Sequence, residues 1–189
     1  MARGRKPIPQ NRPVFVAGEG LSEQGYGRWI GRLGAVYGVP IAVRAEGLHG
    51  GDPLDLVNQA VRKLRIAERR GAKYPIRSLF LDHDTFGKNP ENDQLAIEIA
   101  QDKGFFLIQQ MPCHEGFLLA HFDDCPNPIP NNPPEAMAIL KQIWPNYSKG
   151  MDAIRYGSVL SVGHLERARQ RVRELDDLLS AIGWRVPRS

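Results

Sequence analysis

The chain has 189 residues, of which 42% are hydrophobic and 24% are charged, and its formal net charge is +4. These proportions are ordinary for a folded domain with a full hydrophobic core, so they exclude the disordered and collagen-like classes. The sequence contains no run of 18 apolar residues that could span a membrane, and residues 1–13 lack the apolar core of a signal peptide. We therefore expect a cytoplasmic protein in which Cys113 and Cys125 are reduced thiols.

Four apolar runs predict the strands of a sheet. They are Val14–Ala17, Val39–Val43, Ile76–Leu81 and Phe105–Ile108. Pro40 places the second strand near a sheet edge or marks its start. Helical segments separate the strands, and strands that alternate with helices form a parallel sheet wound by right-handed crossovers. The sequence therefore predicts an α/β fold.

Capping signals and apolar periodicity predict the helices between these strands. A first helix is expected over residues 22–36 with Ser22 as its N-cap, although four glycines weaken it. A second helix follows over residues 53–70, with Asp52 as its N-cap and a proline at its first position. A third is expected near residues 92–103, where a glycine closes it.

The part of the chain beyond the fourth strand is mainly helical. Residues 112–122 predict a short apolar helix or turn, and a connector rich in Pro and Asn follows at residues 123–134. Two further helices are expected at about residues 134–144 and 162–182. The predicted organisation is a basic N-terminal arm, an α/β core and a connector with a helical C-terminal extension, at residues 1–13, 14–122 and 123–189.

Three carboxylates are expected at the carboxyl edge of the sheet, where ligands collect in parallel α/β folds. Glu19 follows the first strand, and Asp82 and Asp84 follow the third. In an extended backbone, residues two apart point to the same face, so Asp82 and Asp84 should lie side by side while His83 faces away. Such a pair suits a hard divalent ion such as Mg²⁺. The alternative is a polar loop after a buried strand, because Asp is also common in turns.

Positive charge is concentrated in two parts of the sequence. The N-terminal arm is basic, and so is the approach to the third strand. Such clusters can neutralise phosphates, although solvated helix faces have the same composition. The residues that we expect to contact nucleic acid are Arg62, Lys63, Arg69, Arg70 and Lys88.

Cysteine and histidine residues near the end of the α/β core raise the alternative of a zinc site. The candidates are Cys113, His114, His121 and Cys125. Their spacing matches no standard zinc site. Cys113 and His121 are more simply explained as positions in the core.

Four segments carry motifs in a fixed order. They read Val-Phe-Val-Ala-Gly-Glu-Gly-Leu-Ser-Glu at 14–23, Gly-Gly-Asp-Pro-Leu at 50–54, Leu-Asp-His-Asp at 81–84 and Met-Pro-Cys-His-Glu-Gly-Phe-Leu-Leu-Ala-His-Phe at 111–122. This ordered set resembles the RloB-like proteins, and Tyr147–Gly150 resembles the C-terminal part of that family. The family carries a Toprim domain, the metal-binding module shared by topoisomerases, bacterial primases and nucleases of the overcoming-lysogenization-defect type. The resemblance covers roughly residues 14–175 and implies a Toprim-like Rossmannoid sheet.

The resemblance implies roles for four carboxylates. Glu19 would act in acid/base or metal chemistry, and Asp82 and Asp84 would bind Mg²⁺ or Mn²⁺. Glu23 matches the second catalytic glutamate of the nuclease branch. From its position alone, Glu23 could equally be a first-turn carboxylate that offsets the helix dipole.

A fifth carboxylate, Glu115, stands in the fourth motif and is implied as a further metal ligand. The family reads Pro-Cys-Phe-Glu followed by a bulky aromatic residue at this point. The present sequence has His114 in place of the phenylalanine and Gly116 in place of the aromatic. These two departures change the packing around Glu115.

The resemblance implies a Mg²⁺-dependent nuclease that acts on DNA or RNA as an effector of abortive infection in bacterial anti-phage defence, with an ATPase of the same system as a possible partner. Metal-bound carboxylates would activate water and stabilise charge on the phosphate. Two alternatives belong to other classes. One is a non-catalytic nucleic-acid-binding or scaffold subunit, and the other is a primase-like phosphotransfer protein.

Overall fold

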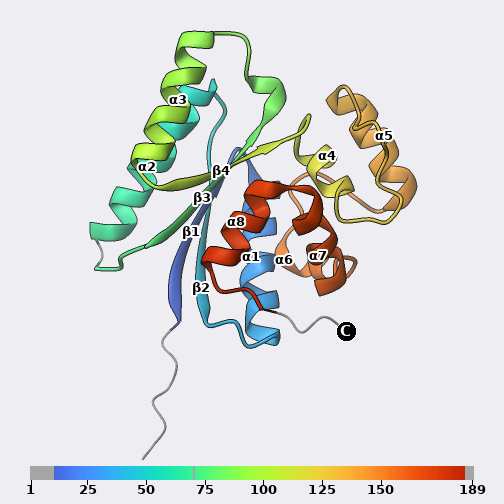
Figure 1. Ribbon diagram of the computed structural model, residues 1–189, viewed down its shortest axis with the longest axis horizontal. Coiled ribbons are helices and arrows are strands. Elements are labelled where there is room, and N and C mark those ends of the chain that lie inside the picture. The colour runs from blue at the N-terminus through green and yellow to red at the C-terminus, as the bar shows by residue number, and fades with distance from the viewer. Residues whose placement is uncertain (1–10, 70, 186–189) are drawn as a thin grey trace, which may run out of the picture.

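Four short apolar segments pair into one parallel sheet with the strand order β2-β1-β3-β4 (Figure 1). The strands are β1 (Arg12–Gly18), β2 (Ile41–Gly47), β3 (Ile76–Asp82) and β4 (Phe105–Gln110). The structure is a computed structural model that describes residues 11–69 and 71–185. Residues 1–10 of the predicted basic arm, and Arg70, lie outside the described residues. The predicted α/β class, with a parallel sheet flanked by helices, is confirmed.

The strand order creates a topological switch point between β1 and β3. The chain passes from β1 to the edge strand β2 and then crosses back to β3 on the other side of β1. Gly18 at the end of β1 pairs with Phe80 near the end of β3. The segments that follow these two strands therefore leave the sheet next to each other, which is where open α/β sheets bind ligands.

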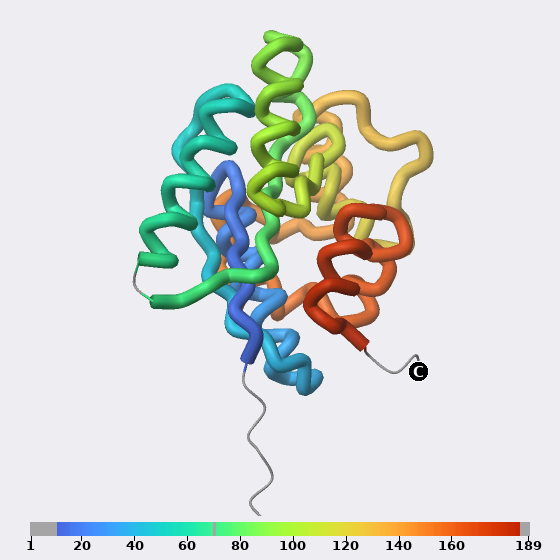
Figure 2. Tube along the Cα trace, turned by 60° about the vertical axis from the view of Figure 1, so that its left-hand side comes forward, coloured from blue at the N-terminus to red at the C-terminus, as the bar shows by residue number. Residues whose placement is uncertain are grey.

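Alternating side chains of the central strands point into two separate hydrophobic layers, one on each face of the sheet. Phe15 and Ala17 of β1 face one layer, which α2 (Pro53–Arg69) and α3 (Pro90–Asp102) cover. Val14 and Val16 face the other layer, which α1 and the C-terminal helices cover. Figures 1 and 2 show α2 and α3 on one side of the sheet and the remaining helices on the other.

The C-terminal helices share the hydrophobic cluster of the sheet and α1. Leu140, Leu165 and Leu179 are fully buried in the same cluster as Val16 and Phe80. Within residues 11–69 and 71–185, no helix combines the length and the apolar character needed to cross a bilayer. The remaining elements are α1 (Leu21–Val36), η1 (His83–Thr85), α4 (His114–Leu119), α5 (Pro133–Ile143), α6 (Ala153–Gly157), α7 (Val162–Arg171) and α8 (Arg173–Ala181).

The prediction of one helix over residues 162–182 is wrong, because the segment forms α7 and α8. Val172 separates them with an extended backbone, at φ −121° and ψ 101°. The side chain of Arg171 donates to the main-chain carbonyls of Ala120 and Phe122, so the end of α7 is fixed to the segment after α4. Apolar periodicity does not reveal the break, because the apolar residues on both sides of Val172 keep helical spacing in the sequence. They are Leu165, Ala168, Leu175 and Leu179.

Glycines in α1 allow close packing on both of its sides. A Cβ atom at Gly27 would lie 2.8 Å from Cγ1 of Val16 on β1. A Cβ atom at Gly25 would overlap the main-chain carbonyl of Met151, in the loop before α6. The glycines that weaken helix propensity are therefore required by the packing of α1 between the sheet and that loop.

We predict that Gly25→Ala lowers the free energy of unfolding by about 2 kcal/mol, because the main chain of Met151 would have to move and the gain in helix propensity does not offset this. Chemical denaturation monitored by circular dichroism measures the change. Gly163→Ala is the matched control, because its Cβ would have contacts no closer than 3.7 Å. This control should be neutral or stabilising by up to ~1 kcal/mol. Equal stability of Gly25→Ala and the wild type would contradict the packing argument.

Candidate active site

A cleft of about 380 Å³ opens at the carboxyl edge of the sheet, at the switch point between β1 and β3. Its walls come from the start of α1, the end of β3, the start of α4 and the loop before α6. The cleft contains four carboxylates and one lysine. The lining residues are Glu19, Gly20, Leu21, Ser22, Glu23, Asp82, His114, Glu115, Lys149 and Gly150.

Glu19 and Asp82 line the cleft, and each has one buried carboxylate oxygen without a hydrogen-bond partner. These atoms are Oε2 of Glu19 and Oδ1 of Asp82. Burial raises the pKa of Asp82 to about 8, and the negative charges of Glu23, Glu19, Asp84 and Glu115 add to the rise. Burial also raises the pKa of Glu19. The main-chain N–H of Asp82 favours the anion of Glu19, but each of the two carboxylates keeps one buried oxygen without a donor.

Glu23 is held at the start of α1 by a capping interaction. Its Oε2 accepts a hydrogen bond from the main-chain N–H of Gly20 at 2.9 Å, and Gly20 is the N-cap of the helix. The prediction that Ser22 caps this helix is therefore wrong. Ser22 Oγ instead accepts a hydrogen bond from the N–H of Gly150 at 2.9 Å. Glu23 is only 4% exposed, so its position is fixed within the cleft wall.

A buried histidine supports Glu23 from α4. His114 Nδ1 lies 3.5 Å from Oε1 of Glu23 and 2.6 Å from the amide nitrogen of Gln110. His114 Nε2 lies 2.8 Å from the hydroxyl of Tyr156. Burial lowers the pKa of His114, so the ring is neutral near pH 7. The ring therefore contacts Oε1 of Glu23, the oxygen that does not accept from Gly20.

Glu115 is anchored on both oxygens. The hydroxyl of Tyr147 donates to Oε1 at 3.0 Å, and the thiol of Cys113 donates to Oε2 at 3.2 Å. Burial alone would raise the pKa of Glu115, but the Cys113 thiol, Lys149, His114 and the Tyr147 hydroxyl favour its anion, and the pKa is lowered on balance. Lys149 Nζ lies 3.7 Å from Oε1. Glu115 thus orients an exposed lysine at the cleft.

Asp84 does not lie beside Asp82 in the way the extended-strand argument predicts. The strand ends at Asp82, and residues 83–85 turn into the 3₁₀ helix η1. The N–H of Asp84 donates to the carbonyl of Pro112 at 3.0 Å, so this turn is tied to the loop before α4. Asp84 is exposed and is not among the residues that line the cleft, although its charge still raises the pKa of Asp82.

The predicted nucleic-acid contacts are not brought together with the carboxylates. Arg62, Lys63 and Arg69 lie in the second half of α2, which runs from the carboxyl edge of the sheet toward the start of β3. The helix covers the face of the sheet opposite to α1, as Figure 2 shows. Lys63 faces Glu46 of β2 at 3.7 Å. Lys88 is exposed in the turn before α3 and does not line the cleft.

The residues considered for zinc have separate protein partners. Cys113 donates to Glu115, His121 contacts the hydroxyl of Tyr26, and Cys125 lies near its neighbouring carbonyl. Within the described ranges, no three Asp, Glu, His or Cys side chains already converge into a metal-binding group. An ion such as Mg²⁺ does not require a group of this kind, because it takes only one or two protein carboxylates and completes its shell with water and phosphate.

Several residues of the site lack a distinctive local sequence signal. Gln110 and Tyr156 form the contacts that hold His114, and Tyr147 and Lys149 reach the cleft from the C-terminal part of the chain. Tyr147 and Lys149 belong to the segment 147–150 that was singled out by resemblance, without an assigned role. Only the packing of the loop before α6 against α1 places Lys149 next to Glu115.

Comparison of the chain with protein-family models, with curated proteins and with solved structures gives no significant match. The resemblance to the RloB-like proteins therefore rests on the ordered motifs themselves.

We predict that Asp82→Asn stabilises the cation-free protein at alkaline pH. The pKa of Asp82 is raised in the folded state, so its contribution to stability is present below about pH 4 and is lost progressively as the pH rises to about 8. The neutral amide avoids this loss. Thermal melts in EDTA should show nearly equal stability at pH 4 and an advantage of about 2 kcal/mol for the variant at pH 9, after allowance for solvent screening.

Asp177→Asn is the matched control for this measurement, because Asp177 is an exposed carboxylate on α8. The control should follow the wild type at each pH. A destabilised Asp82→Asn at pH 9 would show that the Asp82 carboxylate stabilises the folded state, contrary to the argument from burial and repulsion.

Proposed function

We propose that the protein is a divalent-cation-dependent phosphodiesterase that hydrolyses the backbone of DNA or RNA. The observation that carries this proposal is the pair of buried, unpartnered carboxylate oxygens of Glu19 and Asp82 at the switch point of the sheet. Two further carboxylates, Glu23 and Glu115, line the same cleft. A cleft lined by four carboxylates suits a cation, and it suits a substrate that binds together with that cation.

The chemistry of the donors fits a hard cation. A buried carboxylate oxygen without a donor is costly, and nearby negative charges increase the cost. Mg²⁺ and Mn²⁺ favour oxygen ligands, and Mg²⁺ is commonly held by one or two carboxylates. Asp82 would hold the ion, with Asp84 on the adjoining turn as the second candidate. When bound, the ion lowers the pKa of a coordinated water and neutralises charge on phosphate oxygens.

Glu19 is the residue that we assign to proton transfer. Burial raises its pKa, which favours proton uptake, and its buried Oε2 has no hydrogen-bond donor that would compete for the proton. The water oxygen forms a new bond to phosphorus, the bond from phosphorus to the leaving oxygen breaks, and the water proton passes to Glu19. Glu23, fixed by Gly20 and His114, orients the reactants from the opposite wall of the cleft.

Lys149 supplies the cationic side chain of the cleft lining. Its ammonium group is exposed and lies near Glu115, whose two oxygens are already occupied. Lys149 can therefore contact a non-bridging phosphate oxygen while Glu115 keeps it in place. This arrangement gives Glu115 a positioning role, and the loop before α6 becomes part of the site.

The test uses labelled single-stranded DNA, duplex DNA and RNA oligonucleotides, incubated with the purified protein in Mg²⁺ or Mn²⁺. We predict that Glu19→Gln lowers the cleavage rate by about 10²-fold or more while binding of the oligonucleotide is retained, because the amide keeps the shape of the side chain but cannot accept the proton. Glu91→Gln, at an exposed position of α3, is the matched control and should cleave normally.

Product analysis separates hydrolysis from primase-like transfer. Hydrolysis shortens the labelled strand, whereas transfer would lengthen it when nucleoside triphosphates are present. Cleavage by Glu19→Gln at the wild-type rate would contradict the assignment of this residue. A lack of cleavage by the wild type in both metals, on all three substrates, would contradict the proposed function.

A further inference from the structure

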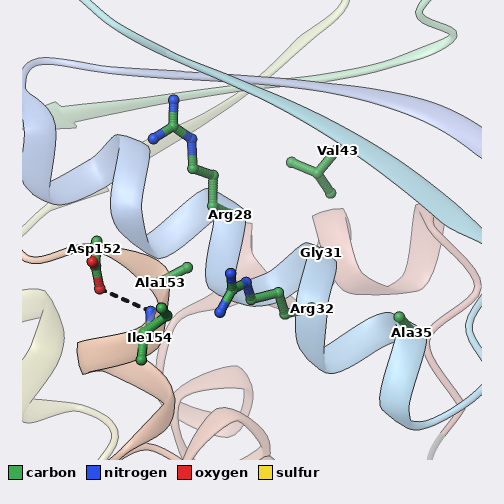
Figure 3. A pocket seen from close by; sticks show the side chains of 8 residues that line it. All are labelled: Arg28, Gly31, Arg32, Ala35, Val43, Asp152, Ala153 and Ile154. Carbon is green, nitrogen blue, oxygen red and sulfur yellow. Dashed lines mark hydrogen bonds between the residues drawn. The ribbon is translucent and has the colours of Figure 1, made fainter.

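A second cavity lies beside the carboxylate cleft, on the face of the sheet that α1 covers. Its volume is about 450 Å³, and it lies between α1, the edge strand β2 and the start of α6. Figure 3 shows Arg28 and Arg32 on α1, Val43 on β2 and the segment from Asp152 to Ile154 around it. We refer to this cavity as the arginine groove.

The arginine groove and part of the cleft are lined by the same two segments, which are α1 and residues 149–154. On α1, Ser22 and Glu23 line the cleft, and Arg28 and Arg32 line the groove farther along the helix. On the opposite wall, residues 149–150 line the cleft and residues 152–154 line the groove. Between these two sets of residues the main chain of Met151 packs on Gly25, so a ligand that spans the cleft and the arginine groove runs over this contact on the surface.

The guanidinium groups of the arginine groove are available to a ligand. Arg28 and Arg32 are exposed, and neither has an ion pair within 4.0 Å among the described residues. The groove contains one carboxylate, Asp152, whose Oδ1 caps α6 by accepting hydrogen bonds from the N–H groups of Ile154 and Arg155. Two cations and one engaged anion leave the groove with net positive charge.

The acidic cleft itself repels a polyanion, so a nucleic-acid substrate requires positive charge close by. Arg32 lies ten positions after Ser22 of the cleft lining, which corresponds to about 15 Å along the helix axis. One strand of a duplex carries a phosphate about every 3.4 Å of axis, so this distance accommodates about four phosphates. We propose that the arginine groove binds the phosphate backbone of the substrate next to the bond that is cleaved. This inference rests on the proposed phosphodiesterase function.

The basic face of α2 is the competing location for such contacts. Arg62 and Arg65 are exposed there, and they line a different cavity between α2 and α3. That cavity lies on the face of the sheet opposite to α1, whereas the arginine groove is lined by α1 itself. A backbone bound on α2 would therefore have to pass around the sheet edge to reach Asp82.

The experiment measures binding of labelled single-stranded and duplex oligonucleotides by fluorescence anisotropy at several salt concentrations, in Mg²⁺. All proteins carry Asp82→Asn, so that cleavage does not interfere. The test variant adds Arg28→Gln and Arg32→Gln, and the matched control adds Arg62→Gln and Arg65→Gln. Both pairs replace exposed arginines three or four residues apart on one helix. Thermal melts verify that all variants are folded.

We expect the Arg28/Arg32 variant to bind about tenfold more weakly at low salt, and its log–log salt slope to be reduced by about 1.4 for a single strand or about 1.8 for a duplex, the values for two lost phosphate contacts. The control should keep the affinity and slope of its parent. Parent-like binding by the Arg28/Arg32 variant, or a loss confined to the α2 variant, would overturn the inference.

The outcome is separable from the test of the proposed function. If the wild type cleaves in a Glu19-dependent manner but the Arg28/Arg32 variant binds normally, the function stands and the groove assignment is wrong. If the wild type neither binds nor cleaves any of the oligonucleotides, the function and the inference both fail.

Discussion

Repulsion among carboxylates at the switch point is the constraint on which the site depends. The ends of β1 and β3 bring Glu19 and Asp82 together because β2 lies on the other side of β1. The start of α1 adds Glu23, whose charge contributes to the raised pKa of Asp82. The cleft leaves one oxygen of Glu19 and one of Asp82 without a donor. The proposed divalent cation would offset this repulsion and bind a phosphate at the same place, which would link the electrostatic cost of the site to its chemistry.

The C-terminal helices complete the site that the sheet begins. Gly25 lets the main chain of Met151 approach α1, and Ser22 fixes the same loop through Gly150. The loop then carries Lys149 to Glu115 at one end and borders the arginine groove at the other. Packing between α1 and a segment more than a hundred residues away in the sequence thus determines which cations face the carboxylates. The hydrophobic cluster shared by α1 and the C-terminal helices stabilises this arrangement.

The parts of this structure that depend on local pattern were predictable from the sequence. Four apolar runs and the helical segments between them predicted the parallel sheet. The ends of the predicted strands placed Glu19 and Asp82 at its carboxyl edge. The turn at η1 was not predictable from strand periodicity, because the tie between Asp84 and Pro112 is a tertiary contact. The same holds for Lys149 and Tyr156, and for the wall of the arginine groove opposite to α1, whose positions follow from how α6 and its preceding loop pack on α1. The break at Val172 was hidden because the leucines on either side keep the helical period.

A melting experiment with Mn²⁺ reports whether a cation binds at the switch point, and it needs no substrate. A cation that binds only the folded state at about 100 times its Kd adds about 2.7 kcal/mol of stability, which raises the Tm of a chain of this size by roughly 5–10 °C. We predict a saturable rise in Tm of this size for the wild type and no such rise for Asp82→Asn. The same Mn²⁺ response in both proteins, or no response in the wild type, would contradict a cation site at the switch point.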